Sequence, residues 1–330
     1  MPAHYPPSAE TALSSAPPAA ALTFDDGQIR TDVALKRLFR WQLSDMKTHT
    51  EGIQHDTDNE NLHQFRIAVR KTRTLLTEIK SVLPPRYEAL FRREFAWLGQ
   101  DTGRGRDLDV YLDSFDTIAA LAGSKRRGAL EPLRAHIAEQ RALEHSRVVD
   151  TLDGARYAAL LESWTSYLEQ PVPQHVGPLN AMRPIGAVAR EHIARTYRRA
   201  EHLASNLSPR AEAEAFHNLR KVCKKERYLF EFFQGLLPNA RLGKVLKIMK
   251  ALQEELGLFQ DLEVQQKHLR TFSADLAPAS RNDDYERAFA RVLRSLEKRE
   301  AKMRGRCIAA WRNFAAAGAH KSFKKHILTR

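Results

Sequence analysis

The chain has 330 residues, 43% hydrophobic and 28% charged, which is enough apolar material for one large or two small buried cores. Its formal net charge of +13 predicts attraction to polyanions, whether nucleic acid, polyphosphate or anionic lipid. No apolar run approaches the roughly 20 residues of a membrane-spanning helix, and the N-terminus lacks the basic and apolar segments of a secretion signal. We therefore expect a cytoplasmic protein that does not insert into a membrane, with Cys223 and Cys307 as packed free thiols.

Apolar residues recur at helical spacing along most of the chain, and no segment shows the period-two alternation of a strand. Proline, alanine and serine dominate residues 1–28, which predicts a disordered tail, and the proline-rich segment 170–183 reads as a linker. Helices are predicted at about 31–55, 62–83, 85–98 and 125–168 in a first half, 29–169. In a second half, 184–318, they are predicted at 184–205, 216–237, 240–256, shortly after 261, and 284–317; residues 319–330 form a basic tail. The predicted fold class is all-α, with two antiparallel helical bundles packed about a pseudo-twofold axis.

A row of cations follows one side of the helix that begins near Leu62. At about 100° per residue, four side chains project within roughly 80° of one another: His63, Arg66, Arg70 and Arg73. We call these four residues the first ridge. Like charges at this spacing repel unless they are neutralised, so the first ridge implies an anionic partner, either carboxylates of the same chain or a ligand.

The same layout returns 154 residues later. His217, Arg220, Lys224 and Arg227, which we call the second ridge, match the first ridge position by position, and Lys225 matches Lys71. The offset continues without a gap to Gly103 and Gly257, and to Asp107 and Asp261. A hydrophobic period alone does not supply shared His, Arg, Gly and Asp, so the sequence indicates an internal duplication.

The pattern H-x2-R-x3-[RK]-K-x-R, followed by L-P and by G-x3-D-L-[DE]-V, resembles the CHAD domain, the conserved-histidine α-helical domain. The resemblance covers about residues 30–320. It implies two similar helical halves, binding of inorganic polyphosphate by basic side chains in a groove between them, and association with polyphosphate granules. The residues that we predict to bind polyphosphate are His63, Arg66, Arg70, Lys71, Arg73, Arg92, Arg93, Arg106, His217, Arg220, Lys224, Lys225, Arg227 and Lys247.

The stretch Gly103-Arg104-Gly105-Arg106-Asp107 lacks the lysine and the strand context of a phosphate-binding loop, so we interpret it as a helix break or cap. Gly103 and Gly257 are then structural. Asp107 and Asp261 are expected to hold a neighbouring backbone or to pair with a ridge arginine, because an unpaired acid beside a polyanion site would repel the ligand.

Several alternatives remain open. The ridges could be ordinary solvated faces. Metal binding by His63 and His217 is disfavoured because the neighbouring arginines repel a cation, and neither a cofactor motif nor the paired carboxylates of phosphoryl transfer are evident. We therefore expect a binding module and no enzyme. Nucleic acid is the alternative ligand, although the ridges offer few aromatic rings on which bases could stack.

Overall fold

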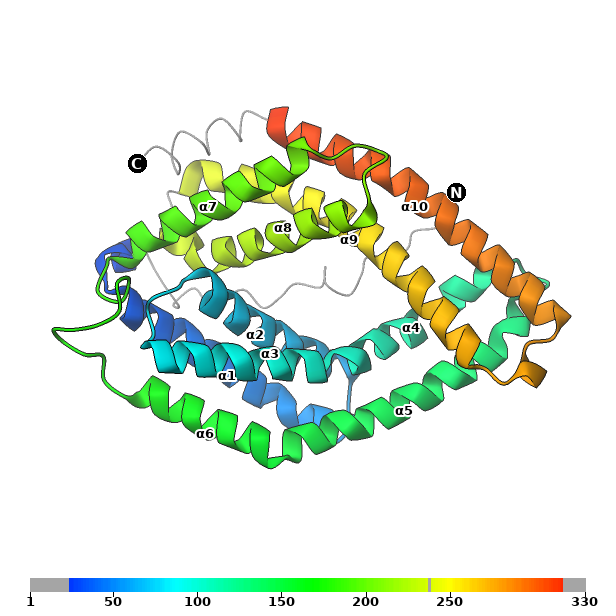
Figure 1. The fold of residues 1–330 in the computed structure, drawn as a ribbon, viewed down its shortest axis with the longest axis horizontal. Helices are drawn as coiled ribbons and strands as arrows, with labels where there is room; N and C mark the ends of the chain where they lie inside the picture. The colour runs from blue at the N-terminus through cyan, green and yellow to red at the C-terminus, as the bar shows by residue number, and fades with distance from the viewer. Residues whose placement is uncertain (1–23, 237–238, 317–330) are drawn as a thin grey trace.

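The computed structural model describes residues 24–236 and 239–316, and within these ranges every regular element is a helix (Figure 1). The all-α prediction is confirmed. The boundary of the predicted N-terminal tail is wrong, because Phe24–Gln28 form a 3-10 helix, η2, that packs on α7. The rest of that tail and the basic tail at 319–330 lie outside the described residues.

The first half contains six α-helices and one short 3-10 helix: α1 (Thr31–Gln54), α2 (Asn59–Glu78), α3 (Pro85–Asp101), α4 (Gly103–Ala120), η3 (Arg127–Leu130), α5 (Glu131–Asp153) and α6 (Ala155–Glu169). Local chemistry explains the boundaries. The Asp58 side chain accepts from the Glu60 N–H and so caps α2, and Pro85 occupies the first turn of α3, where its missing N–H costs nothing. The stretch predicted as one helix over 125–168 is divided at Gly154, whose ψ of 151° is extended.

In the described part, the second half has fewer and longer helices: α7 (Ile185–Ser205), α8 (Ala213–Phe233), η4 (Gln234–Leu236), α9 (Asn239–Asp275), η5 (Pro278–Ser280) and α10 (Asp283–Ala316). The predicted break at Gly257 is wrong, since α9 continues through this residue. The corresponding break in the first half, at Thr102, has additional glycines at Gly99 and Gly105. The second half places the better helix formers Gln253 and Phe259 at those two positions, and they outweigh the cost of one helical glycine.

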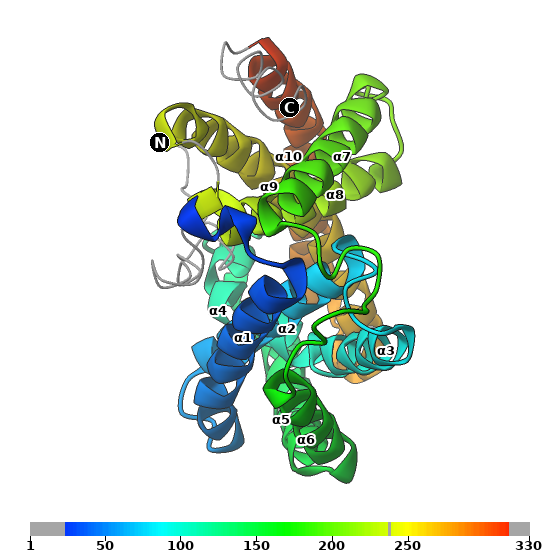
Figure 2. The same cartoon turned by 90° about the vertical axis from the view of Figure 1, so that its left-hand side faces the viewer.

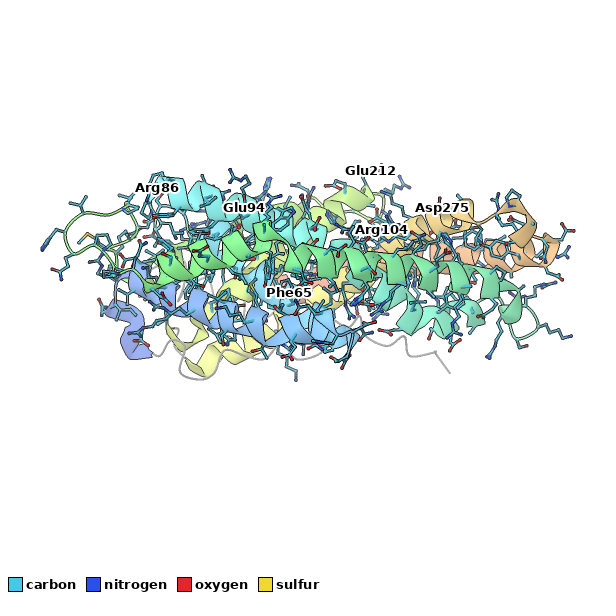
Figure 3. All side chains as sticks on the ribbon, turned by 90° about the horizontal axis from the view of Figure 1, so that it is seen from below. Phe65, Arg86, Glu94, Arg104, Glu212 and Asp275 are labelled. Atoms are coloured by element: carbon cyan, nitrogen blue, oxygen red, sulfur yellow. The ribbon has the colours of Figure 1, made fainter. Side chains whose placement is uncertain are left out.

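Helical hairpins provide most of the packing. α1 lies against α2, α7 against α8, and α9 against α10. Seen from the end, α7 and α8 lie above α1, α2, α3, α5 and α6 (Figure 2). The α9–α10 hairpin is long enough to return to α5 and η3 of the first half, so the second half contacts both ends of the first. The molecule is flat and elongated, with Arg86 of α3 and Asp275 of α9 toward opposite ends (Figure 3).

Aromatic side chains fill the core of the first half. Trp164 of α6 is fully buried, and its ring centroid lies 4.9 Å from that of Phe39, 4.4 Å from that of Phe91 and 5.3 Å from that of Phe95. Edge-to-face pairs of this kind add to the free energy gained by burial. Trp164 thereby fixes α1 and α3 against α6.

The linker between the halves is held by backbone hydrogen bonds. The Thr31 N–H donates to the Arg183 carbonyl over 2.9 Å, and the Asn180 N–H donates to the Ser81 carbonyl over 2.8 Å. Arg30 also donates to the Pro173 carbonyl over 2.7 Å. The linker is therefore anchored to the start of α1 and to the turn after α2.

Candidate functional site

The first ridge lies on α2 and faces the junction of α3 and α4. Arg66 Nη1 donates to the Gly99 carbonyl over 3.0 Å and to Thr102 Oγ1 over 2.9 Å. A Cβ atom on Gly103 would lie 3.6 Å from Arg66 Nη1, an ordinary van der Waals distance, so the guanidinium packs against the first turn of α4 without requiring a glycine at that position. The break therefore holds Arg66 in position.

Arg73 occupies a tighter place on the same junction. A Cβ atom on Gly99 would lie only 2.8 Å from Arg73 Nη1, so the guanidinium rests directly against the glycine. Burial, and to a smaller extent the charge of Arg70, lowers the pKa of Arg73. No carboxylate of the described chain lies within ion-pair distance of Arg73. Arg73 is thus a partly desolvated cation whose charge is not matched by a carboxylate of the described residues.

The second ridge lies on α8 and faces α9. Arg220 Nη2 lies 3.9 Å from Asp261 Oδ1, and His217 Nδ1 forms a hydrogen bond with Gln260 Oε1. Arg227 Nε lies 3.1 Å from Glu231 Oε1, one helical turn further along α8. Carboxylates of the same half therefore accompany Arg220 and Arg227.

The two ridge helices meet at their C-terminal halves. There, a lysine of each helix forms an ion pair with a glutamate of the other. Lys71 Nζ of α2 lies 3.6 Å from Glu231 Oε2 of α8, and Lys225 Nζ of α8 lies 2.6 Å from Glu78 Oε1 of α2. These reciprocal ion pairs fix the two halves against each other at the α2–α8 contact.

Comparison with known protein families matches residues 37–270, more than half of the chain, to the CHAD domain. The chain belongs to the CHAD-domain family. The expectation based on the two ridges and on the Asp-Leu-[Asp/Glu]-Val repeat is confirmed.

Solved structures show the same CHAD fold. The crystal structure of the CHAD domain from the plant Ricinus communis superposes with a TM-score of 0.73 at 23% identity, covering 91% of this chain and 96% of that one. PptA from Streptomyces chartreusis superposes with a TM-score of 0.64 at 15% identity, covering 86% and 99%. At these identities the similarity concerns the fold alone. No curated protein matches the sequence significantly.

Burial changes the interpretation of three predicted ligands of this CHAD domain. Lys71 is 2% exposed, with its Nζ 5.2 Å from the centroid of the Trp41 ring, and burial lowers its pKa although Glu231 and Asp45 act in the opposite direction. His63 and Arg106 are 4% and 7% exposed. These three side chains belong to the interior and not to an exposed cationic face. Lys71 lies about 100° around the helix from Arg70, which turns it toward α1 and α8.

The remaining predicted ligands are accessible but lie outside the ridges. Arg92 pairs with Glu88 of its own helix at 3.6 Å, Arg93 pairs with Glu94 at 2.7 Å, and Lys247 is exposed on α9. Within the described chain, no hydrogen bond or ion pair joins Arg92 or Arg93 to a ridge residue. Their role as ligands stays a prediction.

The two predicted structural aspartates lie at different places in the CHAD fold. Asp261 accompanies Arg220, which is the ridge pairing that the sequence suggested. Asp107 is exposed near α9. Burial lowers the pKa of His268 on α9, and the negative charge of Asp107 acts in the opposite direction. Tyr111 Oη, one turn after Asp107, lies 3.2 Å from His268 Nδ1. Asp107 therefore marks a contact between α4 and α9.

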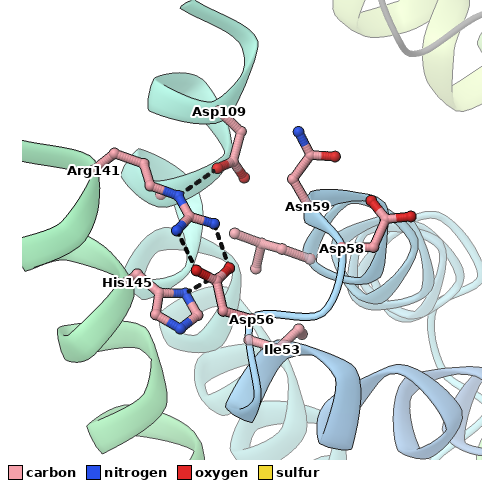
Figure 4. Close-up of a pocket in the computed structure, with 9 residues that line it drawn as sticks. Ile53, Asp56, Asp58, Asn59, Asp109, Arg141 and His145 are labelled. Atoms are coloured by element: carbon pink, nitrogen blue, oxygen red, sulfur yellow. Dashed lines mark hydrogen bonds and ion pairs between the residues drawn. The ribbon is translucent and has the colours of Figure 1, made fainter. Parts of the chain in front are cut away.

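An ion-pair cluster that the sequence did not predict joins α4, α5 and the α1–α2 turn (Figure 4). Arg141 of α5 donates from Nε to Asp109 Oδ1 over 3.0 Å and from Nη1 to Asp56 Oδ2 over 2.5 Å, and His145 Nδ1 lies 3.8 Å from Asp56 Oδ1. Hydrogen bonds from Arg141 lower the pKa of Asp56, whereas burial raises the pKa of the 4% exposed Asp109. The repeated Asp-Leu-[Asp/Glu]-Val motif contains Asp109, but the partner residues Asp56 and Arg141 lie 53 and 32 residues away along the chain. Because Arg141 lies between the two acids and neutralises them, the cluster stabilises the packing of α4, α5 and the α1–α2 turn.

Neither a metal centre nor a membrane span emerges from the described residues. No group of three or more His, Cys, Asp or Glu side chains there is arranged to hold a metal ion. None of the helices in that part is both long and apolar enough to cross a bilayer.

Proposed function

We propose that this CHAD protein binds inorganic polyphosphate along the cationic faces of α2 and α8, as a binding module and not as an enzyme. Arg73 carries this proposal. Its guanidinium is partly buried, its pKa is lowered, and no carboxylate of the described chain compensates its charge. A phosphate oxygen would supply the missing anion through a charge-assisted hydrogen bond, for which a guanidinium is well shaped.

A linear polymer fits the arrangement better than a single phosphate. The first ridge lies on α2 and the second on α8, and these helices contact each other near their C-terminal ends. The cations of the two ridges therefore form two rows that one polymer could follow in succession. A chain of phosphates can neutralise several cations at once and release many condensed counterions. The groove between the halves and the association with polyphosphate granules, both of which the family resemblance implies, are part of this proposal. The cytoplasmic location that we expect from the sequence is also part of it.

The test is a titration of the full chain at near-physiological salt with long-chain polyphosphate, orthophosphate, and single-stranded DNA and RNA of equal charge. We expect affinity to increase with polymer length and to fall steeply with salt. Polyphosphate should bind more tightly than either nucleic acid, since the ridges contain no Phe, Tyr or Trp side chain for base stacking. Equal affinity for orthophosphate and the polymer contradicts the proposal, and tighter binding of DNA or RNA replaces polyphosphate with nucleic acid as the ligand.

A further inference from the structure

Arg73 and Arg227 occupy matching positions on the two ridges but differ in the residue one turn later. Position 231 is a glutamate, whereas position 77, which corresponds to it at the 154-residue offset, is a threonine. Thr77 Oγ1 donates to the Thr74 carbonyl of its own helix over 3.3 Å. The first ridge therefore has no acid where the second ridge has Glu231.

Glu231 engages one cation from each half. Its Oε1 lies 3.1 Å from Arg227 Nε, and its Oε2 lies 3.6 Å from Lys71 Nζ. Its side chain is 25% exposed, and that of Arg227 is 23% exposed, so solvent screens the pair only in part. Glu231 thus places a carboxylate beside the Nε of the guanidinium that a phosphate would otherwise use.

We propose that Glu231 is an internal competitor of the anion, and that a phosphate polymer is held most strongly at the Arg73 end of the first ridge. This inference rests on the proposed function and adds a preferred end to the site. A phosphate at Arg227 must displace Glu231 or bear its repulsion, since two anions that share one cation oppose each other. A phosphate at Arg73 meets no such competitor within the described part of the chain and supplies a charge partner to a partly desolvated cation.

Changing the residues at positions 77 and 231 tests this proposal. Glu231→Gln removes the competing charge and keeps the side-chain shape, and Thr77→Glu installs an acid one turn after Arg73. We expect Glu231→Gln to bind long-chain polyphosphate about three- to tenfold more tightly than the wild type, and Thr77→Glu to bind it about tenfold more weakly, as expected for a gain or loss of roughly one charge-assisted contact.

Two control variants change the same charge outside the ridges. Glu297→Gln removes a half-exposed carboxylate of α10 whose Oε1 lies 2.8 Å from Arg270 Nη2, and Thr271→Glu replaces an exposed threonine of α9 whose hydroxyl donates to a carbonyl of its own helix. Each control should change the affinity by less than about twofold, because exposed charges are screened. Equal shifts in the ridge variants and the controls would mean that only the net charge matters, which overturns the inference.

The double variant Thr77→Glu, Glu231→Gln leaves the net charge unchanged and should reverse the preference between the two ridges. In the wild type, Arg73→Ala should weaken polyphosphate binding more than Arg227→Ala; in the double variant, Arg227→Ala should weaken it more. An unchanged order in the double variant overturns the inference while leaving the proposed function intact. Absence of polyphosphate binding by the wild type overturns both. Melting curves accompany each measurement, and Thr77→Glu, which leaves the Lys71–Glu231 pair in place, keeps the test decisive if Glu231→Gln does not fold.

Discussion

Residues 31–169, which contain the first ridge, carry 21 lysines and arginines and 21 aspartates and glutamates, whereas residues 184–316 carry 26 and 16. The excess positive charge therefore belongs to the half with the second ridge. At the matching positions 73 and 227 the local order is reversed, because Arg227 has Glu231 beside it and Arg73 has no carboxylate of the described chain. Net charge thus steers polyanions toward the protein, while the availability of an individual arginine depends on its neighbours within a few ångströms.

The helix boundaries separate the two halves in a second way. The break at Thr102 frees a carbonyl and a hydroxyl that accept from Arg66, whereas the uninterrupted α9 meets Arg220 with the side chain of Asp261. The first ridge is therefore positioned by neutral backbone and hydroxyl groups as well as by glycine contacts. The second ridge is positioned by an acid that would also oppose an incoming phosphate.

The largest expected effect separates the ridge cations from other exposed cations. Arg70→Ala, Arg73→Ala should lower the affinity for long-chain polyphosphate about a hundredfold, because a partly desolvated, charge-assisted contact is worth roughly 1.5–3 kcal/mol. The matched pair on the second ridge, Lys224→Ala, Arg227→Ala, should lose about tenfold. Isothermal titration at near-physiological salt measures both.

The control is Arg291→Ala, Arg294→Ala, which removes two exposed charges from α10 and should change the affinity less than about threefold. If this variant loses as much affinity as the first-ridge double, the ridges are ordinary solvated faces.

The second prediction concerns the two interhelical ion pairs. Lys71→Ala should lower the free energy of unfolding by about 2–3 kcal/mol, since it empties a buried site and leaves Glu231 with one partner fewer. Lys225→Ala should cost at most about 1 kcal/mol, because the Lys225 side chain is 38% exposed and its pair with Glu78 is screened. Urea denaturation followed by circular dichroism measures both values, and equal losses would show that the two contacts between the halves are equivalent.

The sequence predicted what depends on local periodicity and failed where distant residues decide. The helices that start at Thr31, Pro85 and Ile185 begin within one residue of the predicted starts, because proline, capping residues and the apolar period act locally. The burial of Lys71 depends on Trp41 and Glu231, and the ion-pair cluster at Arg141 depends on Asp56, which lies 85 residues away. The continuity of α9 through Gly257 depends on neighbours that favour a helix more than one glycine disfavours it. None of these can be read from the spacing of the ridge motif alone.

A third prediction compares Glu226 with Thr72, the matching position on α2. Glu226 is 1% exposed, neither of its carboxylate oxygens has a hydrogen-bond partner in the described chain, and burial together with the charge of Glu78 raises its pKa well above the ordinary value. The folded state therefore binds a proton more tightly than the unfolded state, in which the pKa is about 4.3. Proton binding to Glu226 therefore contributes its full stability to the folded state below the unfolded pKa. This contribution is lost as pH rises through the pKa of Glu226 in the folded protein.

Glu226→Gln should accordingly become more stable relative to the wild type as pH rises from 5 to 8, by a few degrees in melting temperature. Calorimetric melts across this range measure the difference. Thr72→Val, at the buried matching position, should show a constant offset from the wild type, because it removes no titrating group. Parallel curves for Glu226→Gln and the wild type would show that Glu226 stays ionised in the folded protein.

The smallest expected effect concerns one glycine from each half. Gly99→Ala and Gly257→Ala should both raise the free energy of unfolding by about 0.5–1 kcal/mol, because alanine loses less conformational entropy than glycine within a helix. Only Gly99→Ala should change binding. Its Cβ would lie 2.8 Å from Arg73 Nη1 and displace the flexible end of that side chain, whereas a Cβ on Gly257 meets nothing within 4 Å. We expect Gly99→Ala to bind polyphosphate about threefold more weakly and Gly257→Ala to bind it like the wild type. Wild-type affinity in Gly99→Ala, with the expected gain in stability, would show that the close seat of Arg73 on α3 is unnecessary for binding and that the difference between the ridges depends on Glu231 alone.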